Sequence, residues 1–241
     1  MSRDAVIHSI DARGVATVLL NCPEVNNAYD DTVIQGLLDA MDALGARGGL
    51  RVVVLRGAGK HFQAGADLNW IRRVAMQSAE ENERASRATA EAVRRLNELP
   101  VPTIALVQGG CFGGGTGIVA ACDVVVAADN AMFSIAETRW GLMAGIILPQ
   151  LADAIGARQV RRYALTGERF GAQEARRIGL VQEQIGRITG FVEEMLAETR
   201  ASTQTRSPLQ LNRVLKQMLL FLEQHLARHQ VHVEAQLAPD L

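Results

Sequence analysis

Residues 109–123, GGCFGGGTGIVAACD, place glycine at positions 109, 110, 113, 114, 115 and 117 and then continue into an apolar stretch. Glycine loses more backbone freedom on folding than other residues, so such a cluster is typical of a tight turn, a close approach of two backbones, or a bound group. A β-branched apolar run at residues 103–109 leads into it. The cluster therefore predicts a strand-to-helix turn whose first N–H groups are open to a ligand.

A phosphate-binding loop is the first interpretation to test. A dinucleotide site needs GxGxxG after a strand, with an acidic residue about 20 positions further on. Asp129 lies near that distance, but Gly110, Gly113 and Gly115 have the two spacings in reverse order. A Walker A loop needs Lys followed by Ser or Thr, and residues 113–117 contain no lysine. Both nucleotide-binding interpretations are disfavoured.

A second turn of small residues occurs in HFQAGADLNW, residues 61–70, after an apolar strand expected at 50–57. It also opens a helix. Two such turns facing each other would direct two backbone N–H donors at one oxygen, which is the usual arrangement for a developing enolate or oxyanion. The residues alone therefore favour chemistry at a carbonyl group.

Hydrophobic periodicity predicts an α/β fold with an α-helical C-terminal section. Strands are expected in a hairpin at 5–10 and 15–20 with Gly14 in its turn, and at 50–57, 103–109, 123–128 and 131–135. Helices are expected at 30–44, from 66 to the prolines at 100 and 102, and at 113–122, 149–167, 171–180, 189–201 and 207–230.

Charge and cysteine content narrow the class of protein. Twenty-five basic and 26 acidic residues give a net charge of −1, so no excess of positive charge favours nucleic acid or an anionic membrane. The three cysteines lack metal-ligand spacing and are expected to be free thiols, with Cys111 and Cys122 buried. No secretory signal and no apolar run of about 18 residues is present, which predicts a cytoplasmic protein without a membrane span.

Several motifs together resemble the enoyl-CoA hydratase/isomerase, or crotonase, superfamily. They are NCPEVNNAYDD, HFQAGADL, GGCFGGGTGIVAACDVVVAADNAMFSIAETRWGL and ALTGERFGAQEARRIGLV, in the order and at the spacing of the family, over roughly residues 5–182. The motifs are most similar to bacterial methylglutaconyl-CoA and isohexenylglutaconyl-CoA hydratase-like members. The resemblance implies a spiral of ββα units over 1–188, a helical oligomerisation region over 189–241, and a homotrimer or a dimer of trimers.

The resemblance also implies a set of site residues. The N–H groups of Ala66 and Gly114 would hold the carbonyl oxygen of an acyl-CoA thioester, and Glu137 would move a proton at the substrate carbon. Positions that match the substrate-binding path are Ala28, Ala64, Gly65, Asp67, Leu68, Gly113 and Gly117. Considered without the family, Asp67 would be a helix cap and Asp123 would fix a turn. No cofactor beyond the CoA of the substrate, and no metal, is implied.

Two departures from the family pattern leave the reaction open. Hydratases with two glutamates carry the second where this chain has Gly117, and Ala144 stands where the family usually has proline. Gly117 is therefore expected to leave space for water or a branched acyl group. The leading interpretation is an enoyl-CoA hydratase acting through an enolate, and the alternatives are a 3-enoyl-CoA/2-enoyl-CoA isomerase with one catalytic Glu, or a catalytically silent member. His225, His229 and His232 have helical spacing and are expected to form a solvated or interface face.

Overall fold

The computed structural model describes residues 4–185 of the chain. These residues belong to the first of two units into which the chain divides, Met1–Ile188, and the second is Thr189–Leu241. The helices expected at 189–201 and 207–230, the three histidines of the last one and the expected oligomerisation region lie outside the described residues. Their roles stay predictions.

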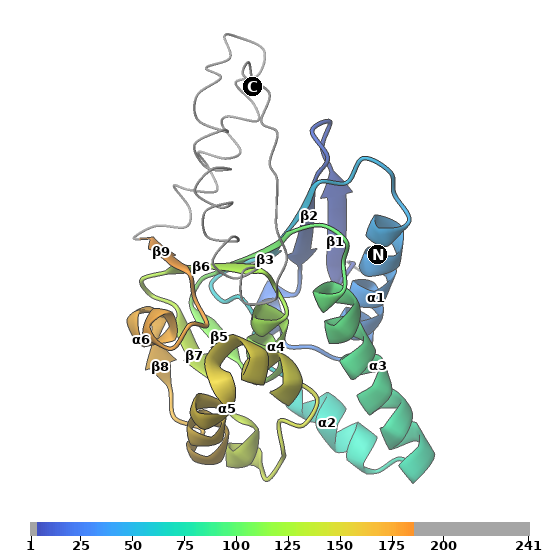
Figure 1. Cartoon of the computed structure of the whole chain (residues 1–241). Helices are drawn as coiled ribbons and strands as arrows, with labels where there is room; N and C mark the ends of the chain where they lie inside the picture. Colours follow the sequence, from blue (N-terminus) through green and yellow to red (C-terminus); the bar gives the residue numbers. More distant parts are fainter. Residues whose placement is uncertain (1–3, 186–241) are drawn as a thin grey trace. The chain divides into compact units, whose positions relative to one another are not determined.

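The larger of two sheets has six strands in the order β1-β2-β3-β4-β6-β9 (Figure 1). The strands are β1 (Val6–Ile10), β2 (Val15–Leu20), β3 (Val52–Gly57), β4 (Thr103–Val107), β6 (Val124–Ala128) and β9 (Glu183–Ile185). β1 and β2 form the expected antiparallel hairpin, with Gly14 at φ +82° in its turn, and all other pairs are parallel. The sequence did not predict β9.

The smaller sheet has the order β5-β7-β8, from Gly110–Phe112, Met132–Ser134 and Phe170–Gly171. β4 of the large sheet is followed by β5 of the small sheet and then by helix α4 (Gly114–Ala120). β6, β7 and the next helices repeat this order. Gln63, after β3, forms a parallel bridge with Cys111 and so gives a third repeat. This is the expected spiral of ββα units.

The remaining helices are α1 (Asp31–Gly45), α2 (Leu68–Ala75), α3 (Ala79–Asn97), α5 (Leu148–Thr166) and α6 (Ala172–Arg177), with short 3₁₀ turns at Pro23–Val25 and Glu137–Trp140. The single helix expected from residue 66 onward was wrong. Ser78 caps a new helix there, because its side chain accepts from the Glu81 N–H while the Glu81 carboxylate accepts from the Ser78 N–H.

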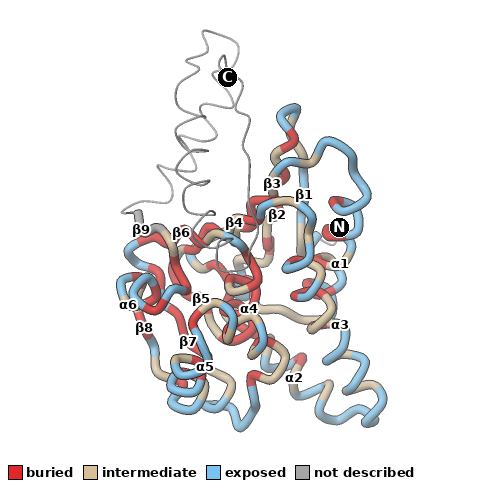
Figure 2. The backbone as a smooth tube through the Cα atoms, in the orientation of Figure 1, coloured by how far each residue is buried: buried red, intermediate tan, exposed pale blue. Residues whose placement is uncertain are grey.

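Buried residues gather on the central strands and on α4, whereas the outer helices keep an exposed face (Figure 2). Cys111 and Cys122 are buried free thiols, as expected. Asp123 joins β6 to β4, because its Oδ2 accepts from the Thr103 N–H at 2.7 Å and from the Thr103 hydroxyl at 2.8 Å. Its structural interpretation is confirmed.

Candidate active site

The turn at residues 63–67 exposes one N–H group by its pairing geometry. Tyr29 donates its N–H to Gly65 O at 2.9 Å, and its C=O accepts from the Asp67 N–H at 2.8 Å. Ala66 lies between these two partners in a parallel bridge, so its own N–H points away from Tyr29. Asp67 caps α2 by accepting from the Trp70 N–H at 2.7 Å, which confirms its expected structural role.

The glycine cluster supplies the second N–H group. Gly113 is the N-cap of α4 at φ +51°, a conformation that favours glycine. Gly114 is the first residue of the helix, and its N–H has no carbonyl one turn earlier to bond. Within residues 4–185, neither the Gly114 N–H nor the Ala66 N–H donates to another group. Both donors are open to a ligand.

The two turns are in close contact. A Cβ added to Gly65 would lie 3.3 Å from Phe112 O and 4.0 Å from Gly113 Cα. Backbone hydrogen bonds of Gln63 connect the two turns. Its N–H donates to Gly110 O, and its C=O accepts from the Phe112 N–H. The Gln63 side chain also accepts from the Gly65 N–H at 3.1 Å. Gln63 therefore fixes both turns, the glycine cluster through its backbone and the 63–67 turn through its fully buried side chain.

Ala66 and Gly114 line the same cavity of about 360 Å³. Apolar residues of α2 and of the segment 142–147 form much of its wall, and Asn82, Ser86 and Thr89 add uncharged polar groups from α3. Glu137 is the only Asp, Glu, Lys, Arg or His among the described residues that line it. The cavity therefore combines two free N–H donors with one carboxylate.

Glu137 begins the 3₁₀ turn after β7, and its carboxylate lies beside the glycine turn. A Cβ on Gly113 would be 3.0 Å from Glu137 Oε1, while Oε2 is buried and has no hydrogen-bond partner within residues 4–185. Burial raises the pKa of Glu137 above its ordinary value of 4.5, and a backbone hydrogen bond of Glu137 itself opposes that rise. A buried carboxylate with one unpaired oxygen and a raised pKa has the properties of a general base.

Tyr29 is a cavity residue that the sequence interpretation missed. Its ring packs edge-on against Trp70, with centroids 5.6 Å apart, and Cε1 would be 2.5 Å from a Cβ on Gly114. Burial first, and the charge of Glu137 second, raise the pKa of Tyr29 to about 12. Its position next to the NNA segment was the available signal, because Ala28 had already been placed on the substrate path.

The space expected beside Gly117 does not exist. A Cβ on Gly117 would lie 2.1 Å from Ile147 Cγ2, and Gly117 does not line the cavity. Ile147 itself lines the cavity and fills the place where a second carboxylate was considered. The expectation of room there for water or a branched acyl group was wrong.

The structure brings most of the other expected positions to this cavity. Those that line it are Ala64, Gly65, Ala66, Leu68, Gly113, Gly114 and Glu137. Ala28 and Asp67 do not line it: Ala28 donates its N–H to Val25 O, and Asp67 caps α2. Ala144, which replaces the usual proline, does line it. Their roles toward a substrate stay predictions.

A second buried amide, on Asn27, holds the loop that carries Tyr29. Asn27 has φ +56° and is fully buried. Its Nδ2 donates to Ala58 O, His61 O and Phe62 O, and its Oδ1 accepts from the Cys22 N–H. Three of these hydrogen bonds tie the loop to the segment that leads into the 63–67 turn, and the fourth closes the loop on Cys22. Asparagine tolerates the left-handed conformation better than other non-glycine residues, which is the physical reason for its presence here.

Within residues 4–185 no helix has the length and apolarity needed to cross a bilayer, and no three side chains of His, Cys, Asp or Glu gather as metal ligands would.

Residues 11–240 match the family described as Enoyl-CoA hydratase/isomerase. The chain belongs to this family. A Thermus thermophilus protein whose name assigns it provisionally to the enoyl-CoA hydratases is 40% identical over 167 residues, which are 69% of this chain and 66% of that protein. Hydroxycinnamoyl-CoA hydratase-lyase of Pseudomonas fluorescens is 37% identical over 175 residues, 71% of this chain and 63% of the relative. The matches thus span just under two thirds of these relatives.

The fold of this family member also matches solved structures. The crystal structure of an enoyl-CoA hydratase from Shewanella pealeana superposes with a TM-score of 0.76 at 26% identity. The superposition covers 90% of this chain and 88% of that one. The match agrees with the alternation between two sheets described above.

Proposed function

We propose that the protein is an enoyl-CoA hydratase-like enzyme that acts on an acyl-CoA thioester through an enolate. The observation that carries this proposal is one cavity lined by two N–H donors without partners within residues 4–185, on Ala66 and Gly114, and by Glu137, whose Oε2 is unpaired. The family of the chain supports it. A carboxylate and two N–H donors directed into one cavity are of little use to a silent binding subunit.

The proposed reaction adds water across the 2,3 double bond. Glu137 takes a proton from water as the water oxygen bonds to C3. The electron pair of the double bond moves into the thioester, and the Ala66 and Gly114 N–H groups stabilise the enolate oxygen. Glu137 then returns the proton to C2, so that one water is gained and the carboxylate is restored.

The proposed acyl group is uncharged. Methylglutaconyl and isohexenylglutaconyl chains end in a second carboxylate, and no lysine or arginine lines the cavity within the described residues. Burying a carboxylate without a cation or hydrogen-bond donors is costly. A neutral acyl chain against the apolar wall suits the cavity better than the glutaconyl-type substrates that the motifs first suggested.

A second candidate function is isomerisation of a 3-enoyl to a 2-enoyl thioester. The observation that favours it is that Glu137 is the one carboxylate in the cavity wall that the structure describes, with Ile147 in place of a second. One carboxylate can take a proton from C2 and return it to C4. Product mass separates the two reactions, because hydration adds one water and isomerisation adds nothing.

Glu137→Gln tests the proposal, because glutamine keeps the shape and loses the proton transfer. We expect kcat for 2-enoyl-CoA to fall by about 10²–10⁴-fold, the usual contribution of a general base, with acyl-CoA binding retained. Glu98→Gln, on the exposed end of α3, is the matched control and should keep full activity. Full activity of Glu137→Gln on both 2-enoyl and 3-enoyl thioesters would contradict both candidate reactions.

We also propose a homotrimer or a dimer of trimers, located in the cytoplasm, with acyl-CoA as the ligand and neither nucleic acid nor a membrane as a partner. Family resemblance supports the assembly, and cysteines without disulfides within residues 4–185 support a reducing compartment. The charge balance supports the absence of a polyanionic partner. Sedimentation equilibrium of the full chain tests the assembly.

A further inference from the structure

The hydration proposed above needs a bound water, and the cavity has few groups to hold one. A buried water usually makes two to four hydrogen bonds to polar partners. Glu137 Oε2 supplies one acceptor. No second carboxylate lines the cavity within residues 4–185, and Ile147 occupies the place beside Gly117 where one was considered. Another side chain has to complete the site.

The Tyr29 hydroxyl is the candidate, because it lines the cavity close enough to Glu137 for that charge to raise its pKa. It makes no hydrogen bond with any group in residues 4–185, and Tyr29 is partly buried against the core. The hydroxyl oxygen is not fully buried and Tyr29 lines the cavity, so this oxygen is open to a water or a ligand bound there.

The position of Tyr29 relative to the reacting groups is fixed from both sides. Its backbone pairs with the turn that carries the Ala66 donor, and its ring edge lies against Gly114, the second donor. A Cβ on Gly114 would be 3.2 Å from the Tyr29 hydroxyl oxygen, and a Cβ on the neighbouring Gly113 would be 3.0 Å from Glu137 Oε1. The hydroxyl and the carboxylate therefore flank two consecutive residues of one turn.

We infer that Tyr29 is a positioning residue that holds the nucleophilic water against Glu137, in a cavity whose described wall has no second carboxylate. The water donates one hydrogen to the Glu137 carboxylate and the other to the Tyr29 oxygen, or accepts the phenol hydrogen. One lone pair on the water oxygen stays free for C3. The phenol does not change its protonation state, so the proton balance of the proposed reaction is unchanged.

Tyr29→Phe tests this inference, which rests on the proposed hydration. The variant keeps the ring on Gly114 and Trp70 and removes only the hydroxyl. Two reactions are measured with the full-length protein: hydration of crotonyl-CoA, and incorporation of solvent deuterium at C2 of butyryl-CoA. The second reaction uses the N–H donors and Glu137 but no nucleophilic water.

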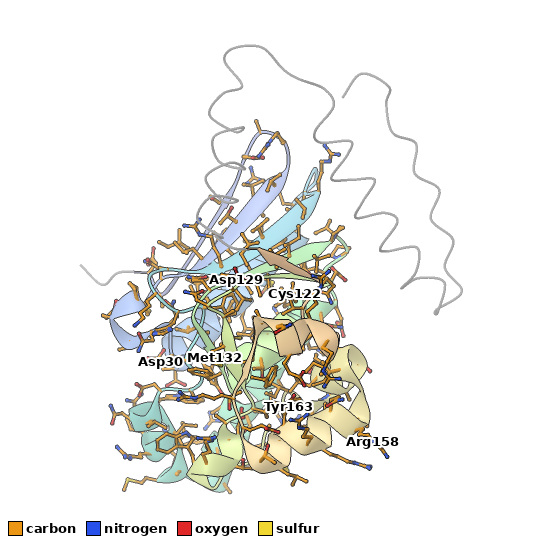
Figure 3. The ribbon with its side chains drawn as sticks, turned by 90° about the vertical axis from the view of Figure 1, so that its left-hand side faces the viewer. Asp30, Cys122, Asp129, Met132, Arg158 and Tyr163 are labelled. Carbon is orange, nitrogen blue, oxygen red and sulfur yellow. The ribbon has the colours of Figure 1, made fainter. Side chains whose placement is uncertain are left out.

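We expect kcat for hydration to fall about tenfold or more in Tyr29→Phe, the size of one lost hydrogen bond, with KM within about twofold. Deuterium incorporation should stay within about twofold of the wild type, and the Tm should be unchanged because no protein hydrogen bond is lost. Tyr163, on α5 and labelled in Figure 3, gives the matched control. Its hydroxyl donates to Glu174 Oε1 at 2.6 Å, so Tyr163→Phe should lower the Tm and leave both rates unchanged.

The outcomes distinguish the inference from the function on which it rests. Equal hydration by the wild type and Tyr29→Phe would overturn the role of Tyr29 and leave the proposed function standing. Equal losses in hydration and in deuterium incorporation would also overturn it, because the hydroxyl would then act on the thioester oxygen. A wild type that exchanges deuterium without hydrating would overturn the hydration and the water site together.

Discussion

At the scale of single residues, burial of the Glu137 carboxylate lowers the stability of the folded protein at neutral pH, and its proposed role as a base explains why it is there. Burial raises its pKa, so the folded protein binds a proton over a pH range where the unfolded chain has released it. This group favours folding fully below its unfolded pKa, and the contribution is lost as pH rises through the folded pKa. A buried carboxylate with an unpaired oxygen is therefore present for function rather than for stability.

Glu137→Gln should consequently raise the Tm at neutral pH, and its advantage over the wild type should shrink as the pH falls toward 4.5. Glu174→Gln gives the opposite sign, because hydrogen bonds from Arg177 first and Tyr163 second lower the Glu174 pKa to about 2. That variant should lower the Tm at neutral pH by a small amount, since the ion pair is solvent-screened. Thermal melts of the three proteins between pH 4 and pH 8 would measure both; a neutral-pH loss in Glu137→Gln would contradict the raised pKa.

Glycine is required at position 117 because Ile147 occupies the space that any side chain there would need. Gly117→Ala places a Cβ 2.1 Å from Ile147 Cγ2, so we expect it to destabilise the protein by about 1–3 kcal/mol through overpacking. Gly45→Ala is the control, since a Cβ there meets nothing within 4 Å. Chemical denaturation measures the difference. Adding Ile147→Ala should recover part of the loss, and equal stability of Gly117→Ala and the wild type would contradict the packing described here.

At the scale of elements, the start of α4 supplies an N–H rather than a side chain, so its test must remove that hydrogen alone. Gly114→Pro does so, and proline is well tolerated at the first position of a helix. Its Cβ would meet the Tyr29 ring, however, at 2.5 Å from Cε1. Gly114→Ala suffers the same contact and keeps the N–H, which makes it the necessary control.

We therefore expect Gly114→Pro to turn over acyl-CoA about 10²–10³-fold more slowly than Gly114→Ala, the effect of one lost oxyanion donor of about 2.7–4 kcal/mol. Circular dichroism confirms that both variants fold. Equal rates in two folded variants would remove Gly114 from the oxyanion hole, whatever their rates relative to the wild type.

The elements that the sequence predicted are those whose signal is local. The hairpin, α1, the β-branched strands and the glycine turn follow from periodicity and turn residues. The break at Ser78 was missed because good helix formers occupy both sides of it, although the pair of Ser78 and Glu81 was a readable capping signal. The strands β5 and β9 have three residues each and depend on pairing partners far along the chain, which no local pattern encodes.

The candidate site likewise combines features with a local sequence signal and features that depend on tertiary packing. The two small-residue turns and Glu137 follow from motifs. The contact between Gly117 and Ile147, and the approach of the Tyr29 ring to Gly114, are tertiary distances between segments 30 and 85 positions apart. Family resemblance places residues on a path, but only packing decides which of them face the cavity.

At the scale of the whole molecule, binding and turnover have to be separated, because a silent family member would do the first alone. A ligand that binds only the folded state at 100 times its Kd stabilises by about 2.7 kcal/mol. For a chain of this length we therefore expect a saturating acyl-CoA to raise the Tm by about 5–10 °C. Single-stranded RNA at equal concentration should leave the Tm unchanged, since the charges of the basic and acidic residues nearly cancel.

The same measurement on Glu137→Gln completes the comparison. This variant keeps both N–H donors and the cavity wall, so the shift with acyl-CoA should persist while turnover is lost. A wild type that shows the shift and converts no 2-enoyl or 3-enoyl thioester would identify the silent member. If acyl-CoA did not raise the Tm of the wild type, that result would contradict acyl-CoA as the ligand and every chemical role assigned to this cavity.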